Sequence, residues 1–369
     1  MALRFHPMQP KDIRECAEII KAHPVIGPRY GRAIGELHSA WTLLIGREAM
    51  TTAVYEEVEG AAVRKCGVAV GLFVHEEFMR ELKTPPLFWF GAELVKRITA
   101  GRSPALSDKE VREANSGEGL NLVVWEALPC LDFATRSDLF HLMIEAFREV
   151  HRGFRLKEMI TSQAESAGRL KWAVDAGGLF WDPAKARYVD SPRKNAEEFV
   201  RKPHVVGITR ELEFARLGSW VGTLFDYLPP RFGFSPSEQR MLLAALAGKS
   251  GTDEELAVAL ALSLPTIKKM WLSVYRRMAE VQPKTIRDSA RPGPAIRDSV
   301  RSAIAVGDST RSGTSVGHFS PSGTSERGKE KRRRLLAYLR DHPEELRPVS
   351  QKHLQQQPPA TKRIHRVQA

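Results

Sequence analysis

The spacing of apolar residues divides the first part of the chain into strands and helices. Two β-rich runs, Met50–Val58 and Lys65–Val74, flank Glu59-Gly60, and this arrangement predicts an antiparallel hairpin. Leu120–Leu128 and Met159–Ser162 predict two further strands. We expect these runs to form one mostly antiparallel central sheet.

Helical spacing occurs between the predicted strands. A helix that Asp12 can cap carries four apolar residues on one face, namely Ile13, Cys16, Ile19 and Ile20. Ser137–Val150 is amphipathic. Arg169–Ala176 ends at Gly177-Gly178, which can supply a left-handed C-cap, and Leu179–Trp181 then begins another strand. Residues 1–190 are therefore predicted to form one α/β domain.

Residues 191–230 have apolar positions at helical spacing, for example Leu212, Leu217 and Leu224, and Leu228-Pro229-Pro230 stops the run. This pattern predicts a helical connector that packs inside the protein or along a dimer seam.

Three helix starts follow Pro230 in close succession. Ser235–Glu238 and Thr252–Glu255 are capping boxes, and Ser263 can cap a third helix. The spacing predicts helices over Glu238–Ala247, over a short run after Thr252, and over Leu264–Val281. Three helices joined by tight turns are typical of a DNA-binding domain, here over residues 231–282.

The third helix has two different faces. Ile267, Trp271, Val274 and Met278 recur at helical spacing and predict an inward stripe. Four basic residues and no acidic ones lie between Thr266 and Arg277. A basic surface without acids can enter a groove lined by phosphates, whereas the simpler interpretation is a solvated helix face.

This stretch resembles the LuxR-type helix-turn-helix domain. The resemblance is carried by S-P-S-E at 235–238, A-L-A-G-K at 245–249, T-x-x-E-L-A at 252–257, T-I-K at 266–268 and V-Y-R-R-M at 274–278. It implies double-stranded DNA as the partner. It also implies that Lys268, Lys269 and Leu272 reach base edges, and that Thr266, Ser273 and Arg276 approach phosphates. Members commonly bind as homodimers, so a homodimer is expected by resemblance.

The order of elements over about residues 3–190 is similar to the GNAT acyltransferase fold. The segment at 155–181, RLKEMITSQAESAGRLKWAVDAGGLFW, looks like the last strand, helix and turn of that family. The family binds pyrophosphate on a glycine-rich turn after the fourth strand, but residues 129–138 contain no glycine. Val174 stands near the position of the catalytic tyrosine of the family. We therefore expect a degenerate scaffold that is kept either for binding a small-molecule effector or for packing.

Charge and complexity change toward the end of the chain. Residues 1–230 are neutral, residues 231–282 carry +2, and residues from Pro283 onward carry +10. Residues 283–330 repeat RDSAR, RDSVR and GDSTR at ten-residue spacing and predict an unstructured linker. Residues 331–369 form a basic tail with a short helix near Glu330–Arg340 and predicted disorder from Pro343. The basic end suits a polyanionic partner.

Three cysteines, at positions 16, 66 and 130, are too widely spaced to form a C-x-x-C pair. This spacing disfavours a metal site or a disulfide and suits a reducing cytoplasm. No apolar run approaches the roughly 20 residues that a membrane crossing needs, and the first ten residues lack a signal-like apolar core. We expect a cytoplasmic protein without cofactor or metal.

Three functions remain open at this point. The leading hypothesis is an α+β transcriptional regulator with a degenerate GNAT-like sensory domain and no catalytic residues. The alternative is an acyl-CoA-dependent N-acyltransferase with an appended DNA-binding domain. The third is an interaction module whose basic tail binds acidic partners or RNA without sequence preference. Asp12 and Glu15 lack the setting of a phospho-acceptor, and the aromatic pattern does not fit an acyl-homoserine-lactone domain.

Overall fold

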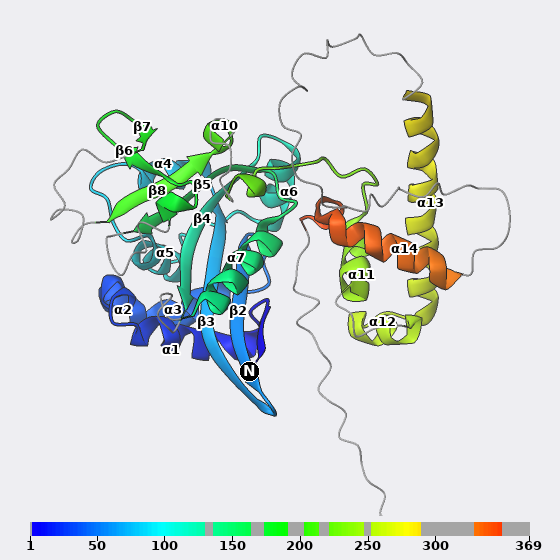
Figure 1. Cartoon of the computed structure of the whole chain (residues 1–369), viewed down its shortest axis with the longest axis horizontal. Helices are drawn as coiled ribbons and strands as arrows, with labels where there is room; N and C mark the ends of the chain where they lie inside the picture. The colour runs from blue at the N-terminus through cyan, green and yellow to red at the C-terminus, as the bar shows by residue number, and fades with distance from the viewer. Residues whose placement is uncertain are drawn as a thin grey trace, which may run out of the picture.

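The computed structural model describes residues 2–129, 136–163, 173–190, 203–213, 221–246, 252–288 and 328–348. Figure 1 shows a sheet with helices on both faces, here called the α/β unit, beside a group of helices, here called the helical unit. The protein is therefore of mixed α and β class, as the sequence predicts.

The elements of the α/β unit begin at the amino terminus. They are β1 (Ala2–His6), η1 (Pro10–Asp12), α1 (Ile13–Ala22), α2 (Ile26–Tyr30), η2 (Gly31–Glu36), α3 (Leu37–Leu44), β2 (Met50–Glu59), β3 (Ala62–Val74), α4 (Glu76–Leu82), α5 (Phe90–Thr99), α6 (Asp108–Ser116), β4 (Leu120–Pro129), α7 (Ser137–His151), β5 (Leu156–Gln163), β6 (Leu179–Asp182), β7 (Arg187–Val189), β8 (His204–Thr209), α10 (Arg210–Glu213) and η3 (Val221–Leu224).

The described strands form one eight-stranded sheet in the order β1-β2-β3-β4-β5-β8-β6-β7. Neighbouring strands are antiparallel except β4 and β5, which are parallel. The prediction of a mostly antiparallel sheet is confirmed. The predicted hairpin is also confirmed, since β2 and β3 pair from Met50↔Leu72 to Glu59↔Ala62 around Gly60, whose φ is +60°.

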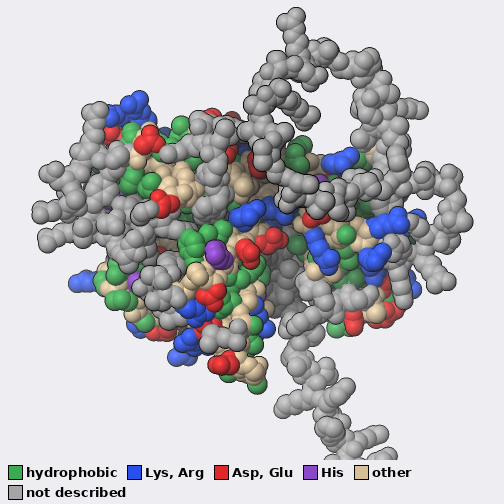
Figure 2. All heavy atoms as spheres, viewed as in Figure 1, with side chains coloured by type: hydrophobic (Ala, Val, Ile, Leu, Met, Phe, Trp, Pro, Cys, Tyr) green, Lys and Arg blue, Asp and Glu red, His purple; other side chains and the backbone are tan. Residues whose placement is uncertain are grey.

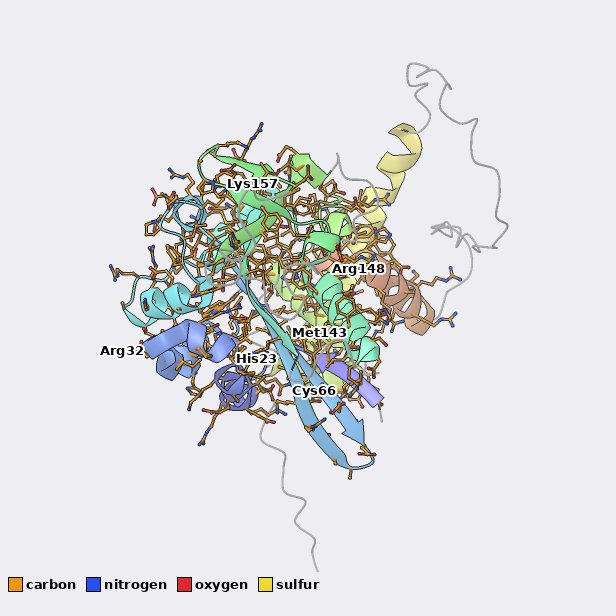
Figure 3. The ribbon with its side chains drawn as sticks, turned by 60° about the vertical axis from the view of Figure 1, so that its left-hand side comes forward. His23, Arg32, Cys66, Met143, Arg148 and Lys157 are labelled. Carbon is orange, nitrogen blue, oxygen red and sulfur yellow. The ribbon has the colours of Figure 1, made fainter. Side chains whose placement is uncertain are left out.

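Helices cover both faces of the sheet. The larger core joins the sheet to α1, α3 and α5, and includes Trp41, Phe73 and Phe90, all fully buried. On the opposite face, α7 packs on β2 and β3 through a smaller cluster in which Met143 lies near Cys66 (Figure 3). Burial on both faces explains why Gly67–Val74 in β3 and Leu122–Trp125 in β4 contain no charged residue.

Two local expectations need correction. Asp12 precedes α1, but its side chain accepts from the backbone N–H of Gln9 at 2.9 Å rather than from the helix. Residues His204–Thr209, expected within a helical connector, form strand β8 between β5 and β6. A short apolar run fits a helix or a buried strand equally well. Here the run forms a strand because it pairs with the otherwise open edge of β5.

The helical unit contains α11 (Pro236–Leu246), α12 (Asp253–Leu260), α13 (Leu264–Asp288), α14 (Gly328–Asp341) and η4 (Pro343–Leu346). Their shared core includes Met241, Leu256, Ile267, Leu335 and Leu339. The predicted helix at the start of the basic tail is confirmed as α14. Helix α13 continues past Pro283 to Asp288, beyond the predicted end at Val281. The rest of the predicted linker, residues 289–327, lies outside the described residues.

Residues 341–348, here called the strap, connect the two units. The carboxylate of Glu345 is fully buried and accepts from the backbone N–H groups of Arg231 and Phe232 at 2.9 and 3.1 Å. The Arg347 guanidinium donates to the carbonyls of Glu149 and Val150 at the end of α7. The predicted disorder from Pro343 is therefore wrong for 343–348, because these polar groups are buried and partnered.

Candidate functional site

A serine or threonine side chain caps the start of each of the three helices that the sequence predicts. Ser235 and Glu238 exchange hydrogen bonds at the start of α11, with the Ser235 N–H donating to Glu238 at 2.7 Å. Thr252 and Glu255 make the same reciprocal pair at the start of α12. The Thr266 N–H donates to Ser263 Oγ at 3.3 Å before α13. All three predicted caps are confirmed, and each satisfies backbone donors that a helix start leaves free.

The chain turns sharply between α12 and α13. The axes of α12 and of the first part of α13 differ by 106° across the three residues 261–263. Ala261 adopts a left-handed conformation with φ +52°, and the Leu262 N–H donates to the carbonyl of Ala257 at 2.9 Å. This closing bond ends α12 and lets α13 start almost at right angles to it.

Helix α13 has the two faces that its sequence predicts. Ile267, Trp271, Val274 and Met278 are buried in the core of the helical unit. Five of the six predicted contact residues are exposed, namely Thr266, Lys268, Lys269, Leu272 and Arg276. Leu272 is 70% exposed, the largest value among the exposed apolar side chains of the described residues. The outward face therefore combines two lysines, an arginine and an accessible apolar side chain.

Ser273 and Arg277 lie on the edge of α13 that faces α11. Arg277 forms an ion pair with Glu238 at 3.1 Å and donates to the carbonyl of Gly233. Burial raises the pKa of Glu238, but hydrogen bonds from Ser235 and Ser273 and the charge of Arg277 bring it below its ordinary value. Ser273, predicted to approach phosphate, is half-buried and bonded to Glu238. The basic charge that faces outward is therefore that of Lys268, Lys269 and Arg276.

A second candidate site lies where β4 and β5 separate. Their pairing runs from Leu120↔Leu156 to Val123↔Ile160, and no later pair joins them in the described residues. Beyond this point β4 remains paired with β3 as far as Pro129, and β5 remains paired with β8 as far as Gln163. The backbone groups that face each other across the gap can therefore bond to a ligand, because the sheet uses only their outer side.

Polar side chains line this cleft on the face covered by α2 and α5. The Tyr30 hydroxyl donates to Glu126 at 2.9 Å and accepts from the Trp125 indole N–H at 3.1 Å. The Arg29 guanidinium lies 4.2 Å above the ring of Trp89. Burial raises the pKa of Tyr30, and the neighbouring Glu126 raises it further. Glu126 is thus an oriented carboxylate that can accept a hydrogen bond or a proton from a ligand.

The opposite side of the cleft is apolar. A cavity of about 70 Å³ lies under α7 and is lined by Val124, Phe147, Met159, Val206 and Val221, among others. Ala127, Thr161 and Gln163 line both sides, so the polar and the apolar hollow adjoin each other at the gap between β4 and β5. The arrangement suits a ligand with one apolar and one polar end.

The start of α7 carries charge that is already paired. Arg136 donates to Glu57 at 2.6 Å and to Asp138 at 2.9 Å. The hydrogen bonds from Arg136 to Asp138 lower the pKa of Asp138 to about 2. With two carboxylates beside it, Arg136 offers little positive charge to a phosphate, although a helix start would otherwise attract one.

Sequence reasoning missed the polar cleft and one part of the helical unit. A charged Glu126 inside an apolar strand was the available signal for the cleft, but Arg29 and Tyr30 come from a helix almost a hundred positions earlier. Helix α14 was predicted as an isolated element, whereas Arg332 forms an ion pair with Asp253 and lies 4.3 Å from the Trp271 ring.

Comparison of the chain with family models, curated proteins and solved structures finds no match. No group of three or more metal-ligating side chains occurs among the described residues. Within the same residues, no single helix has the length and hydropathy of a membrane span, and α12 with the start of α13 meets both criteria only as a bent pair.

Proposed function

We propose that this protein is a DNA-binding transcriptional regulator in which α12 and α13 form a helix-turn-helix and α13 enters the major groove. One observation carries the proposal. Between Thr266 and Arg277 the outward face of α13 is basic and has no acidic residue, it lies opposite a fully packed stripe, and the helix turns 106° from its predecessor over three residues. Helix-turn-helix motifs join helices at about 90–120° through three or four residues. The LuxR-type sequence pattern supports the same assignment.

The outward residues divide into two roles. Lys268, Lys269 and Leu272 lie in the first half of α13, where a reading helix contacts base edges. Lysines can donate to the guanine acceptors, and an exposed leucine can contact a thymine methyl group. Arg276 lies one turn further on and pairs only loosely with Glu280 at 3.8 Å, so it is free to exchange that partner for a phosphate.

Selection of bound sequences from a random duplex pool, with the full chain, tests this function. Lys268→Ala or Lys269→Ala should lower the ratio of specific to nonspecific affinity by roughly 5- to 150-fold, because a lost base contact removes about 1–3 kcal/mol. Arg276→Ala should weaken all duplexes alike and make the salt dependence shallower by about one ion.

Lys109→Ala is the matched control, since Lys109 is a highly exposed lysine on α6 of the α/β unit. Circular dichroism checks that each variant folds. If both lysine variants of α13 bind the selected duplex as tightly as the parent, α13 does not read DNA. Binding that depends on salt but selects no sequence would favour the nonspecific interaction module instead.

The α/β unit, which resembles the GNAT fold in its sequence, is proposed to hold a small-molecule effector in the cleft between β4 and β5. The alternative, an acyl-CoA-dependent N-acyltransferase, is favoured by one observation. Glu126 and Tyr30 lie beside the same gap as the apolar cavity, so a carboxylate that can accept a proton and an apolar space are close together. The paired state of Arg136 and the absence of glycine from 129–138 favour the sensory role.

A further inference from the structure

Helix α14 returns to the helical unit after residues 289–327 and carries a dense group of basic side chains. Its sequence contains five lysine and arginine residues between 329 and 334, with Glu330 as the acid in that half. Lys331, Arg333 and Arg334 are exposed, while Leu335 and Leu339 are buried against the core. The apolar stripe therefore orients the helix so that much of its charge faces solvent.

Arg332 fixes the start of α14 against α12 and α13. Its guanidinium forms an ion pair with Asp253, the first residue of α12, and lies 4.3 Å from the centre of the Trp271 ring. It also interacts with the hydroxyl of Tyr275. Both side chains of the ion pair are only about one-fifth exposed. This contact neutralises Asp253 and fixes the orientation of α14, in which Lys331, Arg333 and Arg334 are exposed to solvent.

The flank of α13 that receives Arg332 borders its outward face. Lys268, Leu272 and Tyr275 are spaced i, i+4 and i+7, so they form one row along the helix. Because Arg332 contacts Tyr275, α14 starts beside this row. In Figure 1, α14 crosses in front of α13, with its amino-terminal end extending beyond it. Figure 2 shows basic side chains gathered over this part of the helical unit.

We propose that α14 is a second arm of the DNA-binding surface, in which Lys331, Arg333 and Arg334 contact the phosphate backbone next to the groove that α13 enters. The inference rests on the proposed function and extends its interface to a helix far away in sequence. The positive charge of α14 and α13 favours a polyanionic partner. Three exposed cations lie beside the basic stretch Thr266–Arg277 of α13, and together they complement a duplex, which carries one negative charge per about 1.7 Å of its axis.

The test replaces all three cations in the full chain, as Lys331→Gln, Arg333→Gln and Arg334→Gln together. The slope of log affinity against log salt should become shallower by about two to three, since each lost phosphate contact removes roughly 0.9 from it. The ratio between selected and unrelated duplexes should stay the same, because phosphate contacts carry no sequence information. Arg333→Gln alone should change the slope by about one.

Arg340→Gln is the matched control, because Arg340 is exposed on the same helix but lies at its opposite end, next to the strap. It should leave the slope unchanged. Thermal melting confirms that the variants fold, and the single variant keeps the test valid if the triple variant does not. An unchanged slope in folded Arg333→Gln and triple variants overturns the proposal. The Lys268 and Lys269 variants test the reading helix separately, so failure of α14 leaves the proposed function intact.

Discussion

Gly153→Ala should release the strap from the α/β unit. Gly153 follows α7 with a φ of +86°, and a Cβ built there would lie 2.6 Å from the backbone nitrogen of Glu344 and 2.8 Å from the backbone carbon of Pro343. Both neighbours are backbone atoms, so no side-chain rotation can relieve the overlap. The strap must move away, and with it Arg347, which donates to carbonyls at the end of α7.

Two effects contribute to the expected loss of stability. An alanine in the left-handed region is unfavourable by about 1–2 kcal/mol relative to glycine. Inserting a methyl group into a packed contact adds about 1–3 kcal/mol. Gly101→Ala isolates the first effect, because Gly101 has a φ of +73° and no atom within 4 Å of its built Cβ.

Urea unfolding and hydrogen exchange measure the outcome. Gly153→Ala should lose about 1–3 kcal/mol more unfolding free energy than Gly101→Ala. Exchange in residues 343–348 should accelerate in Gly153→Ala alone. Equal losses in the two variants, with unchanged exchange in the strap, would refute the close contact between the strap and Gly153.

The remaining predictions concern acid stability and ligand binding. Burial lowers the pKa of His151 to about 4; in the neutral ring Nδ1–H donates to the carbonyl of Phe147 and Nε2 accepts from the Thr51 hydroxyl. A histidine with a depressed pKa in the folded state contributes stability that is complete above about pH 6.5 and is lost as the pH falls toward 4, at most about 3 kcal/mol. In urea unfolding between pH 4 and 7, His151→Gln should make the unfolding free energy depend less on pH, whereas His38→Gln, an exposed control, should not change that dependence. Equal slopes of unfolding free energy against pH in the parent and both variants would contradict the role of His151 in acid stability. Calorimetry should detect no micromolar binding of acetyl-CoA, because Arg136 is already paired and 129–138 lacks glycine. Micromolar binding, with thiol release in the presence of an amine, would instead establish the acyltransferase alternative.

Local patterns account for much of the helical unit. The capping pairs Ser235–Glu238 and Thr252–Glu255 involve residues three positions apart, so their hydrogen bonds can be read directly from the sequence. The same holds for the inward stripe of α13, since a helix converts spacing into a face. The strands β2, β3 and β4 were likewise predictable from β-rich apolar runs.

Other features depend on pairs of residues that are remote along the chain. Strand β8 became a strand because β5 had an edge to pair, and the cleft exists because β4 and β5 stop pairing after Val123↔Ile160. Neither property belongs to a local pattern, because register and edge pairing are set by the whole sheet.

The sequence alone therefore determined the mixed α and β class, the helix boundaries near the caps and the basic face of α13. Tertiary structure decided that α14 packs on Trp271, that Tyr30 meets Glu126, and that the strap joins the two units. The physical reason is range. Caps and stripes arise within one or two turns of a helix, whereas these contacts join residues about 60 to 200 positions apart, and only packing of the complete chain brings them together.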